Sequence, residues 1–171
     1  MSPERRGDIN RLAAMIVDTL GLTAPIDINA VVDGLGGRLR IVSDEDELGV
    51  AKDGNRFVLH IDESSNGNRR FAVAHQLGHL FLHLGYLVNP ELWESSTGYE
   101  DSVLRRFDFS REEEEANEFA SALLMPKEAF MDLVGRFSEN GECKLPAISN
   151  ALQVQSSSVV HRGRNLGVFA S

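Results

Sequence analysis

The chain has 171 residues, of which 42% are hydrophobic and 25% charged, and its formal net charge at pH 7 is −9. This composition is typical of a soluble globular protein, the acidic balance argues against a broad DNA-binding surface, and the longest apolar runs are too short to span a membrane. Cys143 is the only cysteine, which excludes an intrachain disulfide. The first ten residues lack the apolar core of a secretory signal, so we expect a cytoplasmic protein.

The first third of the chain predicts two helices followed by strands. Apolar residues at helical spacing predict an amphipathic helix over residues 9–20. A second helix is expected to begin after Asp27, as its cap, and to end at Gly36-Gly37. The expected strands are residues 38–42, 49–51 and 56–61, with a hairpin turn at 52–55.

The rest of the chain predicts mainly helices. They are expected at residues 68–83, 111–124 and 126–137 and as two short segments within 146–167, with a mixed loop at 85–109 and a turn at 138–144. The pattern indicates an α+β fold in which a small antiparallel sheet packs against several helices, followed by a helical C-terminal tail. The length suits a single domain over 1–171.

Two histidines four residues apart, His75 and His79, are the most informative feature of the chain. On a helix this spacing places both imidazoles on one face, which suits the binding of one zinc ion. The alternative is a pair of core histidines satisfied by hydrogen bonds, since the spacing is common by chance. The surrounding helix is apolar on most sides, and two unpaired imidazoles would be costly there. We therefore interpret the pair as a candidate metal site.

Gln76 stands where zinc hydrolases with an H-E-x-x-H motif carry the glutamate that serves as general base. A carboxamide has nearly the shape of a carboxylate, but it cannot take a proton from the attacking water. The motif therefore predicts the scaffold of a zinc hydrolase whose general base is missing.

The acidic helix expected at 111–124 offers a third metal ligand. At about 100° per residue, Glu112 and Glu113 fall toward its apolar face. The remaining glutamates, Glu114, Glu115 and Glu118, are expected on a solvated face. We choose Glu113 as the third ligand.

Asn117 lies one turn after Glu113 and is expected to orient a neighbouring ligand. The alternative for Glu113 is a capping box that begins at Ser110. Two further residues are possible substrate contacts, His83 and Tyr99. His83 lies one turn beyond His79 and could instead cap the helix end. For Tyr99 the alternative is hydrophobic packing.

The motifs together resemble the ImmA/IrrE-type metallopeptidase domain. Residues 69–83, RRFAVAHQLGHLFLH, are similar to its pattern R-R-F-x-x-A-H-E-L-G-H-x-x-x-H. Residues 113–126, EEEANEFASALLMP, are similar to its second motif, E-x-x-A-N-x-F-A-x-x-L-L-M-P. The tail carries an S-x-x-V-x-x-R-x-x-x-L-G pattern from Ser156 to Gly167, which also looks like the family. The resemblance covers nearly the whole chain.

The resemblance implies a zincin-like, gluzincin-type fold and a site with one zinc on His75, His79 and Glu113, although manganese or iron would also suit such ligands. It divides the chain into N-terminal helices (1–37), a sheet with the zinc-site helices (38–137) and a C-terminal helical segment (144–171). It also implies a protein substrate, a helix-turn-helix transcriptional repressor or antitoxin-like regulator, whose cleavage relieves repression. Membrane attachment and direct nucleic-acid binding are not expected.

The departure from the family pattern is Gln76, which predicts an inactive enzyme with an intact fold and metal site. Two origins are open: an engineered substitution, which the intact His75, His79 and Glu113 set favours, and a natural pseudopeptidase that binds and sequesters a regulator.

Overall fold

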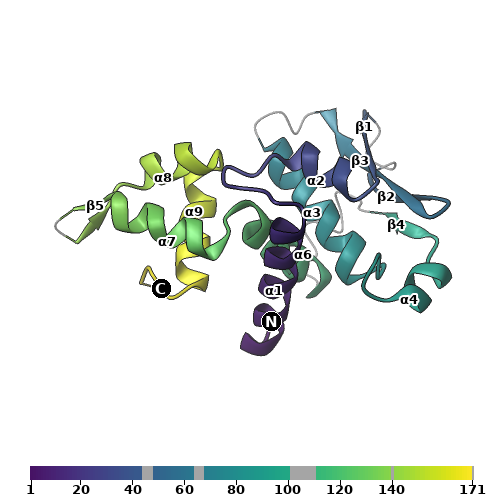
Figure 1. Ribbon diagram of the computed structural model, residues 1–171, viewed down its shortest axis with the longest axis horizontal. Coiled ribbons are helices and arrows are strands. Elements are labelled where there is room, and N and C mark those ends of the chain that lie inside the picture. The colour runs from purple at the N-terminus through teal and green to yellow at the C-terminus, as the bar shows by residue number, and fades with distance from the viewer. Residues whose placement is uncertain (44–47, 64–67, 101–110, 140, 171) are drawn as a thin grey trace.

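The computed structural model describes residues 1–43, 48–63, 68–100, 111–139 and 141–170. Figure 1 shows a sheet at one end of the molecule, a group of C-terminal helices at the other, and two central helices, α3 and α6, between them. The fold is mixed α+β, as the sequence predicts.

The sheet has four strands in the order β1-β3-β2-β4. They are β1 (Arg38–Val42), β2 (Gly49–Asp53), β3 (Arg56–Asp62) and β4 (Gly98–Glu100). β3 buries every second side chain, Phe57, Leu59 and Ile61, against the helices, as expected for a strand with one face on the core. The sheet is mostly antiparallel, but β1 pairs with β3 in parallel. This agrees with the predicted small antiparallel sheet except at one edge, where β1 lies beside β3 and not beside β2, the strand that follows it in the chain.

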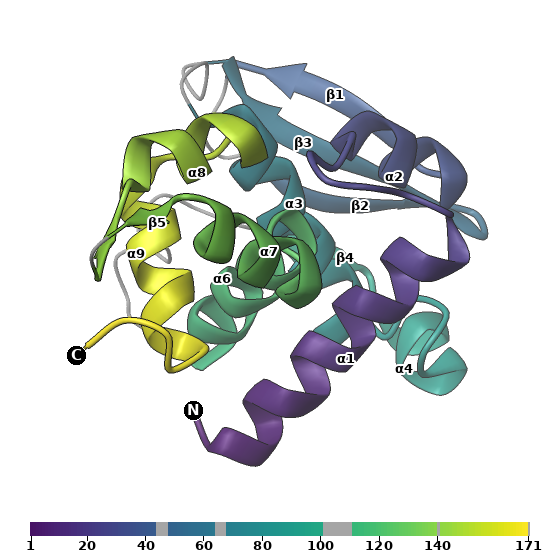
Figure 2. The ribbon, with the colours of Figure 1, turned by 60° about the vertical axis from the view of Figure 1, so that its left-hand side comes forward.

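The helices are α1 (Pro3–Thr19), α2 (Ile28–Gly34), α3 (Arg69–Leu82), α4 (Pro90–Ser95), α6 (Arg111–Leu124), α7 (Lys127–Arg136), α8 (Leu145–Leu152) and α9 (Ser156–Asn165). α3 is buried over most of its length and packs most extensively on α6, which also contacts α1. Figure 2 shows α1 running along one side of α6, with α8 and α9 on the other. No helix among the described residues is long and apolar enough to cross a membrane.

Two predicted boundaries need correction near the N-terminus and in the loop after α3. The first helix begins at Pro3, not at residue 9, because the Ser2 hydroxyl accepts the Arg5 N–H and proline suits the first helical position. The segment expected as a loop contains α4, which Asn89 caps, and β4, which pairs with β2. Strand β4 is only three residues long, too short for a periodic signal.

The remaining differences lie toward the C-terminus. Residues expected as a turn form a small hairpin of β5 (Ser138–Glu139) and β6 (Glu142–Cys143). The predicted cap at Ser110 lies outside the described residues. The two expected tail helices are present as α8 and α9.

Candidate metal centre

The candidate site forms where α3 and α6 cross at very short distance. A Cβ atom on Gly78 would lie 2.8 Å from the Cα of Ala116, so only glycine fits against the α6 backbone here. Gly78 lies between the two histidines of α3, and Ala116 lies one turn after Glu113 on α6. The close crossing therefore brings the candidate ligands of both helices together.

His75, His79 and Glu113 converge on one point. The two Nε2 atoms of His75 and His79 are 3.0 Å apart, and each lies 3.2 Å from an oxygen of the Glu113 carboxylate. All three side chains are buried, and together they form a group whose ligand atoms could hold a metal ion. Zinc ligands about 2.0–2.2 Å from the metal in a tetrahedron lie roughly 3.3–3.5 Å from one another. The distances of 3.0 and 3.2 Å between the donor atoms of His75, His79 and Glu113 agree with this range to within a few tenths of an ångström.

The Glu113 carboxylate is held in its charged form. Burial alone would raise its pKa, but the hydrogen bonds and the charges of His75 and His79 outweigh burial and set the pKa well below the ordinary value. Glu113 is therefore deprotonated, which is the state that a carboxylate needs to bind a metal.

The outer nitrogen of each histidine has a polar partner. His75 Nδ1 lies 3.0 Å from Asn117 Oδ1, and because an amide oxygen only accepts, His75 donates this hydrogen bond. His79 Nδ1 lies 2.9 Å from Nδ1 of His83. When the two rings are neutral, as metal ligands must be, a proton on each outer nitrogen leaves both Nε2 lone pairs directed at the cluster. Asn117 thus contacts a candidate ligand, and its orienting role stays a prediction.

His83 joins the site through His79, one turn before it, and through Glu115, a contact that the sequence does not indicate. Its Nε2 lies 3.6 Å from Glu115 Oε2, and Glu115 in turn is bound by Arg5 of α1 and by Arg111. The pKa of His83 is lowered to about 4, first by burial and then by the neighbouring His79, so the ring is neutral at pH 7. His83 contacts a candidate ligand; a contact with substrate remains a prediction.

The prediction of a solvated face for Glu115 and Glu118 is wrong. Both are buried, because α1 and α9 cover this side of α6 and supply arginines to it. Glu114 is exposed, as predicted. Arg5 in α1 precedes Glu115 by 110 residues, and Arg162 in α9 follows Glu118 by 44. A local pattern in α6 therefore does not reveal these arginine partners.

Tyr99 covers the site from the edge of the sheet. Its ring stacks on His79 with 3.9 Å between ring centroids and 22° between planes, and its hydroxyl donates to Glu112 at 3.1 Å. Tyr99 therefore packs, as the alternative proposed, and the residue on which it packs is the candidate ligand His79.

A cavity of about 230 Å³ opens beside the cluster. It is lined by Asn68, Phe71, Ala72, His75, Gln76, Glu113 and Asn117. Gln76 is 1% exposed and lines the same cavity as the candidate ligands, one residue along α3 from His75. A general base would have to occupy such a place to reach water in the cavity.

Two histidines on one helix face a glutamate on a second helix beside a cavity, and this arrangement could hold a metal ion. The family model for the IrrE N-terminal-like domain, a peptidase family, matches residues 39–162. The chain therefore belongs to the IrrE N-terminal-like family of metallopeptidases, and the predicted resemblance is confirmed. No curated protein gives a significant match to the chain.

Proposed function

We propose that this protein is a zinc peptidase of ImmA/IrrE type whose general base is replaced by Gln76, and that its substrate is a helix-turn-helix repressor or antitoxin-like regulator. The observation that carries the proposal is the convergence of His75, His79 and Glu113 next to a cavity that Gln76 lines. Membership of the family supports the general part of the proposal, namely that the protein is a metallopeptidase and acts on proteins.

The residues divide the chemistry between them. His75, His79 and Glu113 would hold one zinc, which supplies Lewis-acid chemistry and lowers the pKa of water toward about 7. Asn117 and His83 keep the two imidazoles in the tautomer that directs Nε2 inward. The substrate carbonyl would enter the cavity beside Gln76.

Gln76 determines whether turnover follows binding. A glutamate at this position would take a proton from water and return it to the leaving amine, whereas an amide only forms hydrogen bonds. Since general acid–base catalysis contributes roughly 100- to 10,000-fold, we propose that the chain binds its substrate and cleaves it slower by about that factor. We further propose that the glutamine is an engineered replacement, because the three ligands are all retained.

The direct test is the Gln76→Glu variant, loaded with zinc and incubated with repressors encoded beside its gene. Cleavage by this variant, at least about 100-fold faster than by the parent chain, supports the proposal. The variant Gln76→Glu/Glu113→Gln is the matched control and should lose both zinc and cleavage.

The second candidate is a natural pseudopeptidase that sequesters the regulator, and Gln76 itself is the observation that favours it. This candidate predicts tight binding of the regulator by both the parent chain and Gln76→Glu, with cleavage by neither.

A further inference from the structure

A second cavity adjoins the candidate metal site at the N-terminal end of α3. It has a volume of about 260 Å³ and is lined by Asn68, Arg69, Arg70, Phe71, Leu124, Gln153, Val154 and Gln155. Asn68 and Phe71 also line the cavity of the candidate metal site. The two cavities therefore share a wall at the N-terminal end of α3.

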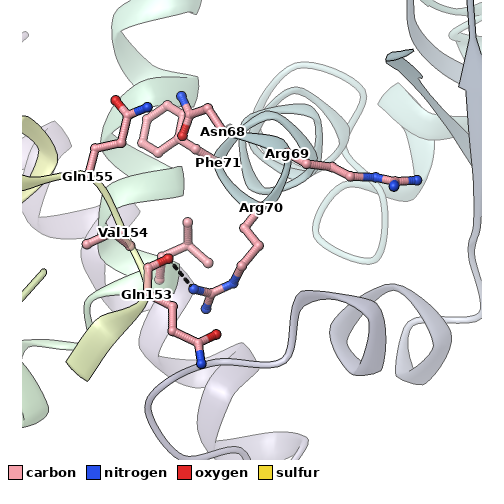
Figure 3. Close-up of a pocket in the computed structure, with 8 residues that line it drawn as sticks. Asn68, Arg69, Arg70, Phe71, Gln153, Val154 and Gln155 are labelled. Carbon is pink, nitrogen blue, oxygen red and sulfur yellow. Dashed lines mark hydrogen bonds between the residues drawn. The ribbon is translucent and has the colours of Figure 1, made fainter. Parts of the chain in front are cut away.

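The second cavity has an apolar floor and an amide rim. Phe71 and Val154 are half-buried and Leu124 is fully buried. Figure 3 shows the side-chain amides of Asn68 and Gln155 turned toward each other beside the Phe71 ring. An apolar floor suits an uncharged, apolar side chain, and side-chain amides can bind both the N–H and the C=O of a peptide backbone.

The arginines do not make the cavity a site for anions. Arg70 donates to the backbone carbonyls of Ile26 and Leu152 at 2.6 and 2.9 Å and to that of Gln153. Its guanidinium thus fastens α3 to the segment before α2 and to the end of α8. Figure 3 shows the Arg69 side chain directed away from the cavity.

The spacing along α3 fits the reach of a peptide. Phe71 and Asn68 precede His75 by four and seven residues, which is roughly 6 and 10 Å along the helix axis at about 1.5 Å per residue. An extended peptide advances about 3.3 Å per residue. A side chain within about three residues of the scissile bond can therefore reach the second cavity.

We propose that this cavity, formed by the N-terminal end of α3 and the turn between α8 and α9, is a specificity pocket for an apolar side chain of the peptide substrate. Asn68 and Gln155 bind the adjoining substrate backbone at its rim. The inference rests on the proposed function and extends it: the C-terminal helices, which lie outside the α3–α6 pair, select the sequence that is cut.

The test uses peptide hydroxamates, which anchor on zinc, and measures binding by calorimetry to the zinc-loaded chain with Gln76 in place. One probe, acetyl-Leu-Gly hydroxamate, extends toward the N-terminal side of a substrate. A second, the succinyl hydroxamate of leucine amide, extends toward the C-terminal side. Each is compared with its analogue that has glycine in place of leucine, and acetohydroxamate reports on the metal alone.

In at least one of the two pairs we expect the leucine probe to bind about tenfold or more tighter than its glycine analogue. Val154→Trp, which fills the cavity, should abolish this preference and leave the affinity for acetohydroxamate unchanged. Gln155→Ala should weaken the binding of both the leucine probe and its glycine analogue severalfold. The Gln155 side chain makes no capping hydrogen bond to α9, so the helix should remain intact. Ser157→Ala is the matched control, since Ser157 is exposed on α9 and does not line the cavity, and it should change neither affinity.

Two negative outcomes are distinguishable. If acetohydroxamate binds but neither leucine probe is preferred, or Val154→Trp keeps the preference, the specificity pocket is refuted and the metal site stands. If the chain takes up no zinc and acetohydroxamate does not bind, the proposed function fails and the specificity pocket with it.

Discussion

The Nδ1 atoms of His79 and His83 lie 2.9 Å apart, one helical turn from each other at the C-terminal end of α3. If His79 presents Nε2 to a metal, its Nδ1–H donates a hydrogen bond to Nδ1 of His83. The proton of the neutral His83 ring is then on Nε2, which lies 3.6 Å from Glu115 Oε2. A chain of contacts thus runs from a candidate ligand through His83 and Glu115 to Arg5 of α1.

The first prediction concerns His83. His83→Ala removes the partner of His79 Nδ1 and should weaken zinc binding about 10- to 100-fold, because such partners fix ligand orientation. A competition titration against a chelator of known zinc affinity measures this change. His161→Ala, on the exposed side of α9, is the control and should bind zinc like the parent chain. Equal affinities for the two variants would remove His83 from the site.

The second prediction concerns Asn117, which has the same role toward His75. Asn117→Ala should weaken zinc binding by a factor in the same range, since His75 Nδ1 loses its acceptor. Asn117→Asp keeps an acceptor of the same size and should retain most of the affinity. An Asn117→Asp variant as weak as Asn117→Ala would show that the amide, rather than its oxygen, is what matters.

The third prediction concerns the helix crossing. Gly78→Ala places a Cβ 2.8 Å from the Ala116 Cα, so α3 and α6 must separate. We expect a loss of about 1–3 kcal/mol in the free energy of unfolding together with weaker zinc binding. Urea denaturation measures the first quantity. Gly135→Ala in α7, where a Cβ meets open space, should instead be neutral or stabilise by up to about 1 kcal/mol.

The fourth prediction concerns the buried pair of Arg162 and Glu118, which joins α9 to α6. Arg162 is 1% exposed and also donates to the Met125 carbonyl and to Asn10. Arg162→Met should cost about 3 kcal/mol or more in the free energy of unfolding, because Glu118 loses a buried cation. Arg164→Met, an exposed change on the same helix, should cost less than about 0.5 kcal/mol. Thermal or urea unfolding of the two variants side by side decides the matter.

The fifth prediction concerns Tyr86, whose hydroxyl donates to the Leu35 carbonyl at 2.8 Å and joins the end of α3 to α2. Burial raises the pKa of Tyr86 above its ordinary value of 10. A pKa raised in the folded state contributes stability that is complete below about pH 10 and is lost as the pH rises through the higher folded pKa. Tyr86→Phe should therefore cost about 1 kcal/mol at pH 7 and should show a shallower loss of stability above pH 10. Urea titrations at pH 7 and at pH 10–11 test both parts.

Local patterns in the sequence predict most of the helices, three of the strands of the four-stranded sheet and the apolar core residues of α6. The period of each helix places His75 and His79 on one face of α3 and Glu113 toward the apolar face of α6, whereas only the resemblance to the family predicts that these residues come together. Features that depend on contacts between distant segments are not accessible in this way. The parallel pairing of β1 with β3 and the three-residue strand β4 are of this kind.

The same distinction explains the candidate site. The period of α6 suggests water around Glu115 and Glu118, yet both carboxylates are buried because arginines from α1 and α9 reach them. Tyr99 reaches His79 only because β4 pairs with β2. The cavity between α3 and the turn at 153–155 likewise depends on how the C-terminal helices pack. Each of these features joins parts of the chain that no short motif spans.

The most direct measurement is the zinc content of the chain, purified without metal-affinity resin or chelators, dialysed against zinc and analysed by plasma mass spectrometry. We predict about one zinc per chain, and a loss of most of it in His79→Ala and in Glu113→Gln. Glu114→Gln, an exposed neutralisation one residue away, should keep the full content. A parent chain without zinc, or a Glu113→Gln variant that holds as much as the parent, would contradict the assignment of His75, His79 and Glu113 as the metal site.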